Sequence, residues 1–463
     1  MRRWTLASLT LAVAAASTAL AGERSVTTPK EADGYRGIWY FNQPSGDKYK
    51  YKYSGGLGTY CAKHLPLAVY AEEANKTFFV YGGTSKGRRN LLEMVAYYDH
   101  ATGTLPRPRV LRDKRTSDAH DNPVLALDPK GHLWVFCSAH GTARPSYLYR
   151  SVEPYAIDAF ELVWETNFSY PQPWWIEGKG FLFLHTLYRK GRILHWATSP
   201  DGRTWSEARR LAAIPQGHYQ VSWRHGTRVG TAFNTHPRGK GVNWRTNLYY
   251  LETPDFGQTW RTAHGETLET PLTEIRNPAL VHDYQAEGLL VYLKDINFDA
   301  EGRPVVLYVT SKGYQAGPEN NPRTWTTARW TGSQWDIQGH IVSDSNYDTG
   351  CLHIEADGTW RLIAPAETGP QPFNPGGEVA IWTSTDQGKT WHKLRQLTRQ
   401  SPYNHTYCRR PVDAHPDFYA LWADGHGRQP SPSRLYFCDR TGQRVLRLPP
   451  QMEGPTARPQ PVE

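Results

Sequence analysis

The chain has 463 residues and is rich in Trp (18), Tyr (27), Gly (40) and Pro (34) but holds only 3 Met. This composition favours strands and turns over helices, and the length suits one large all-β domain or two ordinary domains. The formal net charge is +9 and the basic residues are dispersed, which argues against a nucleic-acid-binding motif and favours an acidic polysaccharide as partner.

The amino terminus has the pattern of a signal peptide. Arg2 and Arg3 precede an apolar run (residues 4–20), which ends in the small-residue pattern Ala19-Leu20-Ala21. The run is short and rich in Ala and Ser, so we expect no membrane span. The sequence therefore predicts a signal peptide over residues 1–21 and a secreted or periplasmic protein.

A strand and a basic, aromatic loop come before the repeated part of the chain. Residues 34–42 (GYRGIWYFN) are predicted to form a strand, and residues 47–56 (DKYKYKYSGG) to form the loop. Because propellers often join their two ends through one strand, we expect residues 34–42 to complete the last blade.

A strand–turn–strand unit then recurs along the chain. In its clearest copy, PVLAL (residues 123–127) and HLWVF (residues 132–136) flank the turn DPKG. The copies start 46 to 73 residues apart, near His64, His120, Gln172, His218, Asn277, Gly350 and Arg410. A period near fifty residues with strand hairpins is typical of β-propellers. We therefore predict an all-β fold, a seven-bladed β-propeller of four-stranded antiparallel blades, forming one domain over residues 34–448.

Three turns carry a second signal, the Asp box, S/T-x-D-(x)-G-x-T-W. It occurs at residues 199–205 (SPDGRTW), 253–260 (TPDFGQTW) and 384–391 (STDQGKTW). The Asp is expected to accept backbone N–H groups, the Gly to adopt a positive φ, and the Trp to pack between blades. The boxes are strong evidence for the architecture and weak evidence of chemistry.

The carboxyl-terminal residues 449–463 are rich in proline, and we expect a disordered tail. The five cysteines are widely spaced, which argues against a disulfide framework. His405, Cys408 and His415, or Cys351 with His353, could hold a metal, although small residues within a sheet are the simpler reading. The metal content is left open, with a structural calcium or zinc ion as the alternative to none.

The candidate site follows from blade topology. In each blade the start of the first strand and the end of the second lie on one face, around the mouth of the channel. His120 and His140 take these two positions in one hairpin, and other polar residues reach the same face. These are Lys63, His64, Arg144, Tyr188, His218, Tyr219, Asn234, Arg410 and, from the loop after Asn234, Arg245. Polar capping of the sheet ends is the alternative reading of each histidine.

The residue types at this mouth favour β-elimination at a uronic acid. A classical glycosidase would need a facing pair of carboxylates, and few are expected here. Elimination needs a cation to relieve the substrate carboxylate, a base for the C5 proton and an acid for the departing O4. Arg, His and Tyr supply these roles, and no cofactor is required.

The motifs SGGLGTYCAKH, DAHDNP, SAHGTARPSY, GHYQVSW, FNTHP and WRTNLYY, together with the Asp boxes, resemble the bacterial neuraminidase repeat (BNR) family. The resemblance is to the subgroup of ulvan lyases and related rhamnosidases. It implies that His120, His140 and Tyr219 are catalytic and that Arg245 binds the substrate carboxylate. In the rhamnosidase branch a single histidine acts, and its counterpart here is His64.

Three functions remain open from the sequence. The first is a lyase that cleaves rhamnose–uronic acid linkages, the second an exo-acting α-L-rhamnosidase, and the third a non-catalytic carbohydrate-binding propeller. In each case the partner is an acidic polysaccharide or oligosaccharide that contains rhamnose and uronic acid, and a monomer is expected. The substrate-binding set is Arg245, Lys63, Arg144, Tyr188, His218, Asn234 and Arg410.

Overall fold

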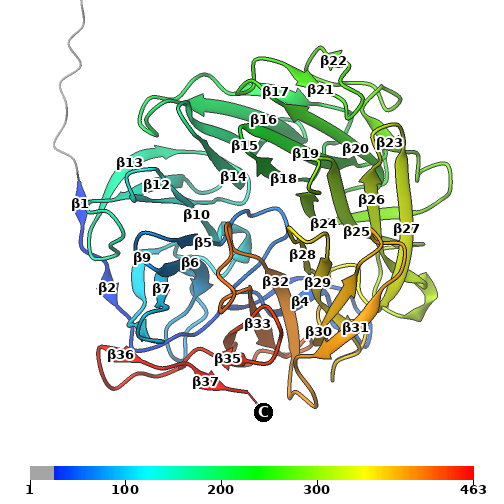
Figure 1. Ribbon diagram of the computed structural model, residues 1–463. Coiled ribbons are helices and arrows are strands. Elements are labelled where there is room, and N and C mark those ends of the chain that lie inside the picture. The colour runs from blue at the N-terminus through cyan, green and yellow to red at the C-terminus, as the bar shows by residue number, and fades with distance from the viewer. Residues whose placement is uncertain (1–24, 463) are drawn as a thin grey trace, which may run out of the picture.

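Seven antiparallel sheets stand around a central axis like the blades of a propeller (Figure 1). The computed structural model describes residues 25–462, so the predicted signal peptide lies outside the described residues. Within that range the only helical segments are two short 3-10 turns, η1 (Ala119–Asp121) and η2 (Pro318–Asn320), and no helix there is long and apolar enough to cross a membrane. The predicted all-β, seven-bladed architecture is confirmed.

Each blade is built from consecutive strands, ordered from the channel outwards. They are β5 (Ala68–Ala71), β6 (Lys76–Gly83), β7 (Leu92–Asp99) and β9 (Arg109–Asp113) in blade 1; β10 (Pro123–Leu127), β11 (Leu133–Cys137), β12 (Ser146–Ser151) and β13 (Phe160–Thr166) in blade 2; β14 (Ser169–Ile176), β15 (Gly180–Tyr188), β16 (Arg192–Ser199) and β17 (Arg209–Ala212) in blade 3; β18 (Gln220–His225), β19 (Arg228–Thr235), β20 (Thr246–Thr253) and β21 (Trp260–Arg261) in blade 4; β24 (Leu290–Phe298), β25 (Pro304–Ser311), β26 (Arg323–Trp330) and β27 (Trp335–Ser343) in blade 5; β28 (Cys351–Ile354), β29 (Trp360–Glu367), β30 (Glu378–Ser384) and β31 (His392–Gln396) in blade 6; and β32 (Asn404–Arg409), β33 (Ala420–Gly425), β34 (Leu435–Cys438) and β35 (Val445–Arg447) in blade 7.

The remaining strands extend the blades or lie between them. They are β1 (Val26–Thr27), β2 (Lys30–Glu31), β3 (Trp39–Pro44), β4 (Tyr51–Gly56), β8 (Leu105–Pro106), β22 (Thr267–Leu268), β23 (Leu280–His282), β36 (Thr456–Ala457) and β37 (Gln460–Pro461). β1 adds to the outer strand of blade 2 and β2 to that of blade 1.

Burial explains why the inner strands have almost continuous apolar sequences. Every residue of β11 and β33 is buried, because neighbouring blades cover both faces of an inner strand, whereas outer strand β31 is mostly exposed. The Asp-box turns close the outer hairpins as predicted. The Asp201, Asp255 and Asp386 carboxylates each accept a backbone N–H, at 2.7–2.9 Å from the nitrogens of Thr204, Thr259 and Thr390.

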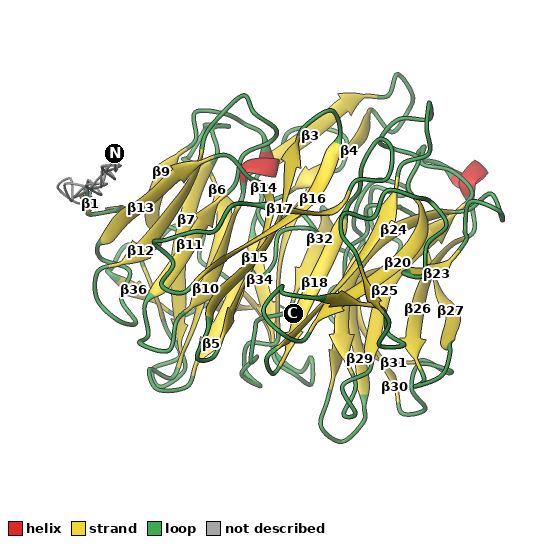
Figure 2. Ribbon diagram, turned by 90° about the horizontal axis from the view of Figure 1, so that it is seen from above, coloured by secondary structure: helices red, strands yellow, loops and turns green. Residues whose placement is uncertain are grey.

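Both ends of the chain differ from the prediction. β3 pairs with β4 and does not complete the last blade. The β3–β4 hairpin lies at the end of the ring where η1 is also found (Figure 2). The tail, expected to be disordered, instead forms two short strands. β36 pairs with β8 beside blade 1, and β37 extends blade 7. A proline-rich strand is tolerated at these sheet edges because one side needs no hydrogen bonds.

In two blades the first strand is not the segment that was predicted. In blade 5 the apolar segment near Asn277 was predicted as the first strand, but its strand β23 adds to β20 of blade 4, and β24 is the first strand. In blade 7 the first strand was predicted to begin at Arg410, but β32 ends one residue earlier. Apolar alternation identifies a strand without saying to which blade it belongs, which explains both errors.

Candidate active site

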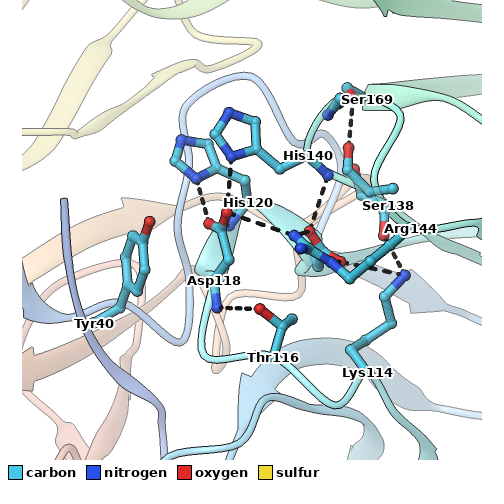
Figure 3. Close-up of polar contacts among 12 residues, drawn as sticks. Tyr40, Lys114, Thr116, Asp118, His120, Ser138, His140, Arg144 and Ser169 are labelled. Carbon is cyan, nitrogen blue, oxygen red and sulfur yellow. Dashed lines mark hydrogen bonds and ion pairs between the residues drawn. The ribbon is translucent and has the colours of Figure 1, made fainter. Parts of the chain in front are cut away.

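A tight turn before β10 places one carboxylate beneath two imidazoles. Asp118 caps η1 by accepting the backbone N–H of His120 at 3.0 Å. The first two strands of blade 2 then run out and back, with Pro123 paired to Cys137, so His140 returns beside His120. Figure 3 shows both rings above Asp118. The hairpin therefore brings the predicted histidine pair together.

The two histidine rings share the Asp118 carboxylate. Their Nδ1 atoms lie 2.6 Å (His120) and 2.8 Å (His140) from its two oxygens, and the rings stack with centroids 3.9 Å apart. Burial alone would raise the pKa of Asp118, but the two histidines hold it well below its usual range. An ionised Asp118 keeps a proton on each Nδ1, which leaves each Nε2 as an acceptor. A metal ion held by Asp118, His120 and His140 would require these bonds to break.

The two histidines differ in what their Nε2 atoms meet. His120 Nε2 lies 2.8 Å from the Tyr60 hydroxyl and 2.9 Å from that of Tyr53. Burial lowers the pKa of His120 to about 4, so its ring is neutral near pH 7. Among the described residues none bonds to His140 Nε2, and a quarter of that side chain (26%) is exposed. His140 is thus the imidazole available to a ligand.

This pair opens onto a hollow of about 650 Å³ at the channel mouth. Several blades and the β3–β4 hairpin supply its walls. Besides the two histidines, its polar and aromatic lining consists of Asn42, Gln43, Lys52, Tyr53, Tyr60, Lys63, Tyr170, Arg192, Tyr219, Arg245, Tyr292, Lys294, Asn346, Tyr347, Thr349 and Tyr407. No Asp or Glu is among the described residues that line it, so the hollow suits an anion.

The cations of the hollow are held by neutral groups. Arg245 is 6% exposed, and its guanidinium lies 4.3 Å from the ring centres of both Tyr219 and Tyr292. Lys63 Nζ donates to the Leu293 carbonyl at 2.7 Å, and burial lowers the pKa of Lys63 to about 7. Burial likewise lowers the pKa of Lys52 to about 7, helped by the charge of Arg245. An incoming anion would stabilise the charged form of both lysines.

Tyrosines connect the histidines to these cations. Tyr219 lies between the Arg245 guanidinium at 4.3 Å and that of Arg192 at 5.4 Å from its ring centre. The Tyr188 hydroxyl accepts from Arg192 Nε at 3.2 Å, and burial raises the pKa of Tyr188 to about 12. Tyr188 is therefore a protonated phenol near neutral pH, and its ring centre is 6.0 Å from that of His140.

Of the predicted residues, His120, His140, Tyr219, Lys63 and Arg245 line the hollow, and Tyr188 adjoins it through His140. His64 does not line it. It is fully buried between Tyr60 and Tyr170, and neither ring nitrogen has a hydrogen-bond partner among the described residues. A side chain that is fully buried and outside the lining of the hollow does not contact a substrate bound there.

Three other predicted residues serve the scaffold. Arg144 lies behind the histidines and forms an ion pair with Asp121 at 2.8 Å. His218 Nε2 accepts the Ile214 N–H at 3.0 Å, and the Asn234 side chain accepts the Tyr219 N–H at 3.1 Å. Both positions fix the backbone that carries Tyr219.

Arg410 lies inside the channel. It pairs with Asp295 at 2.8 Å and stacks 3.3 Å from the Trp223 ring centre. The shifted frame of blade 7 explains why it is not at the mouth, since Arg410 follows the first strand instead of beginning it.

The sequence analysis missed Asp118 and most of the cationic wall. We use this name for the lysines and arginines that line the hollow, which are Lys52, Lys63, Arg192, Arg245 and Lys294. Asp118 stands in the quoted motif DAHDNP, two residues before His120, and Lys52 and Tyr53 stand in the basic, aromatic loop. Arg192 and Lys294 carry no sequence signal, because they begin or lie within ordinary strands.

Comparisons with known proteins agree with this architecture. A model of the family described as "BNR repeat-containing family member" matches residues 92–340. The ulvan lyase of Nonlabens ulvanivorans is 22% identical over 348 residues, which cover 67% of this chain and 72% of that protein.

Two solved structures share the fold. An ulvan lyase of polysaccharide lyase family PL25 superposes with a TM-score of 0.66 at 16% identity, covering 89% of this chain and 96% of its own. The polysaccharide lyase Uly1 superposes with a TM-score of 0.61 at 10% identity, covering 89% of this chain and 100% of its own.

Proposed function

The chain belongs to the BNR repeat-containing family, and we propose that it is a polysaccharide lyase that cleaves uronic acid-containing chains by β-elimination. One observation carries the proposal. A pair of imidazoles on a shared carboxylate opens onto a hollow lined by five cations and, among the described residues, by no Asp or Glu. The lyase activity of the ulvan lyase relatives supports it.

The cations would bind the uronate carboxylate. Abstraction of the C5 proton places negative charge on the carboxylate, and fixed positive charge stabilises that charge as it forms. Arg245 has a planar guanidinium suited to a carboxylate, and its aromatic neighbours leave it without a competing anion among the described residues. Lys63 adds a second positive charge at the same wall.

His140 and Tyr219 would move the protons. His140 Nε2 takes the C5 proton, and the C5–H electron pair forms the C4=C5 double bond as the C4–O4 bond breaks. The Tyr219 hydroxyl gives its proton to O4, which leaves as a free hydroxyl on the neighbouring sugar. Asp118 holds the His140 proton on Nδ1 throughout, so Nε2 begins as the base. The chemistry as written uses no cofactor.

The same geometry disfavours a hydrolase. Glycoside hydrolysis ordinarily uses two carboxyl groups, and none of the described residues lining the hollow supplies one. The rhamnosidase reading rests on His64, which is fully buried.

More specifically, the proposed substrate is a rhamnose–glucuronate polymer. The PL25 ulvan lyase has been solved with the saccharide GlcA(1-4)Rha3S bound, which carries a carboxylate and a sulfate. A hollow with several unpaired cations accommodates two anionic groups of this kind. Export from the cytoplasm is part of the proposal and rests on residues 1–21.

Product analysis tests the proposal. The protein is incubated with ulvan, and products are followed by ultraviolet absorbance and mass. We expect an unsaturated uronate and loss of this signal in His140→Ala, with His282→Ala, a histidine on β23 away from the hollow, as the matched control. Free rhamnose without the unsaturated product would mean hydrolysis, and binding without any product would mean a non-catalytic propeller.

A further inference from the structure

The β3–β4 hairpin carries aromatic side chains on both of its faces, because alternate residues of a strand point to opposite sides. Tyr40 faces the histidine pair, and its ring centre lies 6.0 Å from that of His120. Trp39 and Phe41, with Tyr51 of β4, form a second aromatic group, whose ring centres lie 4.5–6.0 Å apart. None of these three residues lines the hollow. The hairpin thus has an aromatic face outside the hollow.

This aromatic face is open to a ligand and held in place. Phe41 is 38% exposed and Tyr51 is half-buried. Trp39 is buried, and its Nε1–H donates to the His426 carbonyl at 2.8 Å, which fixes the indole beneath the other two rings. Exposed apolar surface of this kind marks sites of interaction, and a rigid aromatic ring can pack against the C–H face of a sugar at little cost in entropy.

A groove of about 1010 Å³ begins at Trp39, where blades 1 and 7 meet. Its walls are the β6–β7 and β33–β34 connections. Gly37 passes between them, bridges Gly83, and donates its N–H to the Ser433 carbonyl at 3.0 Å. Both connections follow the second strand of their blade, as His140 does in blade 2. The groove therefore lies on the same face of the ring as the hollow.

Three exposed cations line this groove from the β6–β7 connection. They are Lys86, Arg88 and Arg89. The Arg89 guanidinium lies 5.9 Å from the Trp39 ring centre, so it joins the groove to the aromatic face. Among the described residues, no carboxylate forms an ion pair with any of these three side chains, and no Asp or Glu lines the groove. The groove is accordingly suited to an anionic ligand.

Two other arginines of the lining are already neutralised. Arg36 pairs with Asp33, and Arg434 pairs with Asp424 at 2.6 Å. The hydrogen bond from Arg36, with a smaller effect of the Lys86 charge, lowers the pKa of Asp33, which stays ionised and bound to Arg36. The cations of the β6–β7 connection are therefore the ones that an incoming anion would meet.

We propose that the groove and the aromatic face together form a second subsite for an acidic polysaccharide. A carboxylate or sulfate of one sugar lies against Arg88 and Arg89, because guanidinium groups bind such anions with paired hydrogen bonds. A neighbouring sugar packs on Phe41. The identity of the polymer rests on the proposed function, since the chain whose uronate occupies the hollow continues across the rim of the ring. Two linked sites hold a long chain more tightly than one site holds a short chain.

Binding of long and short ulvan chains tests this subsite. Calorimetric titrations use His140→Ala, which the proposed mechanism leaves inactive, and compare size-fractionated long chains with a tetrasaccharide. We expect the long chains to bind at least about tenfold more tightly. Adding Arg88→Gln and Arg89→Gln should weaken long-chain binding by about tenfold without changing the affinity for the tetrasaccharide. Phe41→Ala, which alters no charge, should weaken long-chain binding by about fivefold.

The matched control is Arg209→Gln with Arg210→Gln. These two adjacent, exposed arginines lie on β17, and their replacement removes the same charge from another blade. Long-chain affinity should then stay as it was. An equal loss of affinity in this control, or no loss in Phe41→Ala, would reveal unspecific attraction of a polyanion and overturn the subsite. Equal affinity for long and short chains, or no ulvan binding, would overturn it too.

The subsite and the lyase proposal fail separately. A wild-type protein that binds long chains through Arg88 and Arg89 but forms no unsaturated uronate retains the subsite and refutes the lyase chemistry. A protein that forms the unsaturated product but binds long and short chains alike retains the lyase chemistry and refutes the subsite.

Discussion

Replacing Asp118 with asparagine tests the proposed arrangement of protons most directly. The Oδ1 atom accepts the His120 backbone N–H at 3.0 Å and its Nδ1–H at 2.6 Å, and Oδ2 accepts the His140 Nδ1–H at 2.8 Å. An amide has one accepting oxygen, which His120 occupies with two donors. The amide NH₂ then faces His140 Nδ1, and the His140 proton moves to Nε2, where the base should be.

The size of the effect follows from what is lost. A positioned general base contributes roughly 10²–10⁴-fold, and the corresponding Asp→Asn change in serine proteases lowers kcat by about 10⁴. We expect kcat of Asp118→Asn to fall by about 10³, or about 4 kcal/mol of activation free energy. KM should change little, because Arg245 and Lys63 remain. One lost charge-assisted hydrogen bond also lowers the free energy of unfolding by about 2 kcal/mol.

Initial rates of unsaturated uronate formation give kcat and KM separately. Asp386→Asn removes an Asp-box carboxylate at the opposite end of its blade and serves as the matched control, with unchanged kcat expected. If a folded Asp118→Asn protein keeps kcat within about tenfold of wild type, less than any positioned base supplies, the assignment of His140 as base is wrong.

Four further predictions follow from the same contacts. Arg245→Lys should raise KM for ulvan at least about tenfold, since an ammonium replaces a guanidinium that binds carboxylates with two hydrogen bonds, and unchanged initial-rate kinetics would refute its role. Lys52 and Lys63, with pKa values lowered to about 7, lose charge as pH rises, so KM should rise between about pH 6 and 8. For the same reason the folded chain binds fewer protons than the unfolded chain from about pH 7 to 10.5. The unfolding free energy of the ligand-free protein, measured by denaturant titration, should therefore rise with pH across that window. The slope of unfolding free energy against pH should be smaller in Lys63→Met. Arg410→Met leaves Asp295 buried without its partner and should lower the unfolding free energy by about 3–5 kcal/mol, whereas the double variant with Asp295→Asn should recover most of it.

The fold was predictable because its signals are local. A short apolar run, a polar turn and a second apolar run identify a hairpin wherever they occur, and the Asp boxes fix the outer turns in the same way. Family membership was also predictable, since motifs such as DAHDNP mark this region of the chain. The hairpin rule alone placed His120 and His140 together, because strand ends determine their position and no long-range packing is needed.

Errors arose where the position of a residue depends on distant parts of the chain. β23 was expected to be the first strand of blade 5, but it pairs with β20 of blade 4. Blade 4 has an extra segment that local patterns do not reveal. Arg410 was expected at the mouth, and only the shift of β32 shows that it points into the channel toward Asp295. Asp118 was missed for another reason. A 3-10 turn of three residues carries no hydrophobic periodicity, yet it is this turn that folds the carboxylate beneath both imidazoles.

The cationic wall links the stability of the protein to its proposed function. Lys294 is 3% exposed, donates to the Asn346 carbonyl at 2.7 Å, and has its pKa lowered by burial and by the charge of Lys63. Cations that repel one another in a buried site destabilise the free protein, and removing one would stabilise it unless an anion is bound. Such an arrangement is understandable when a substrate carboxylate or sulfate supplies the missing charge. We therefore expect Lys294→Met to raise the melting temperature of the free protein and to weaken substrate binding. A variant that gains no stability would show that the wall is already neutralised without a ligand.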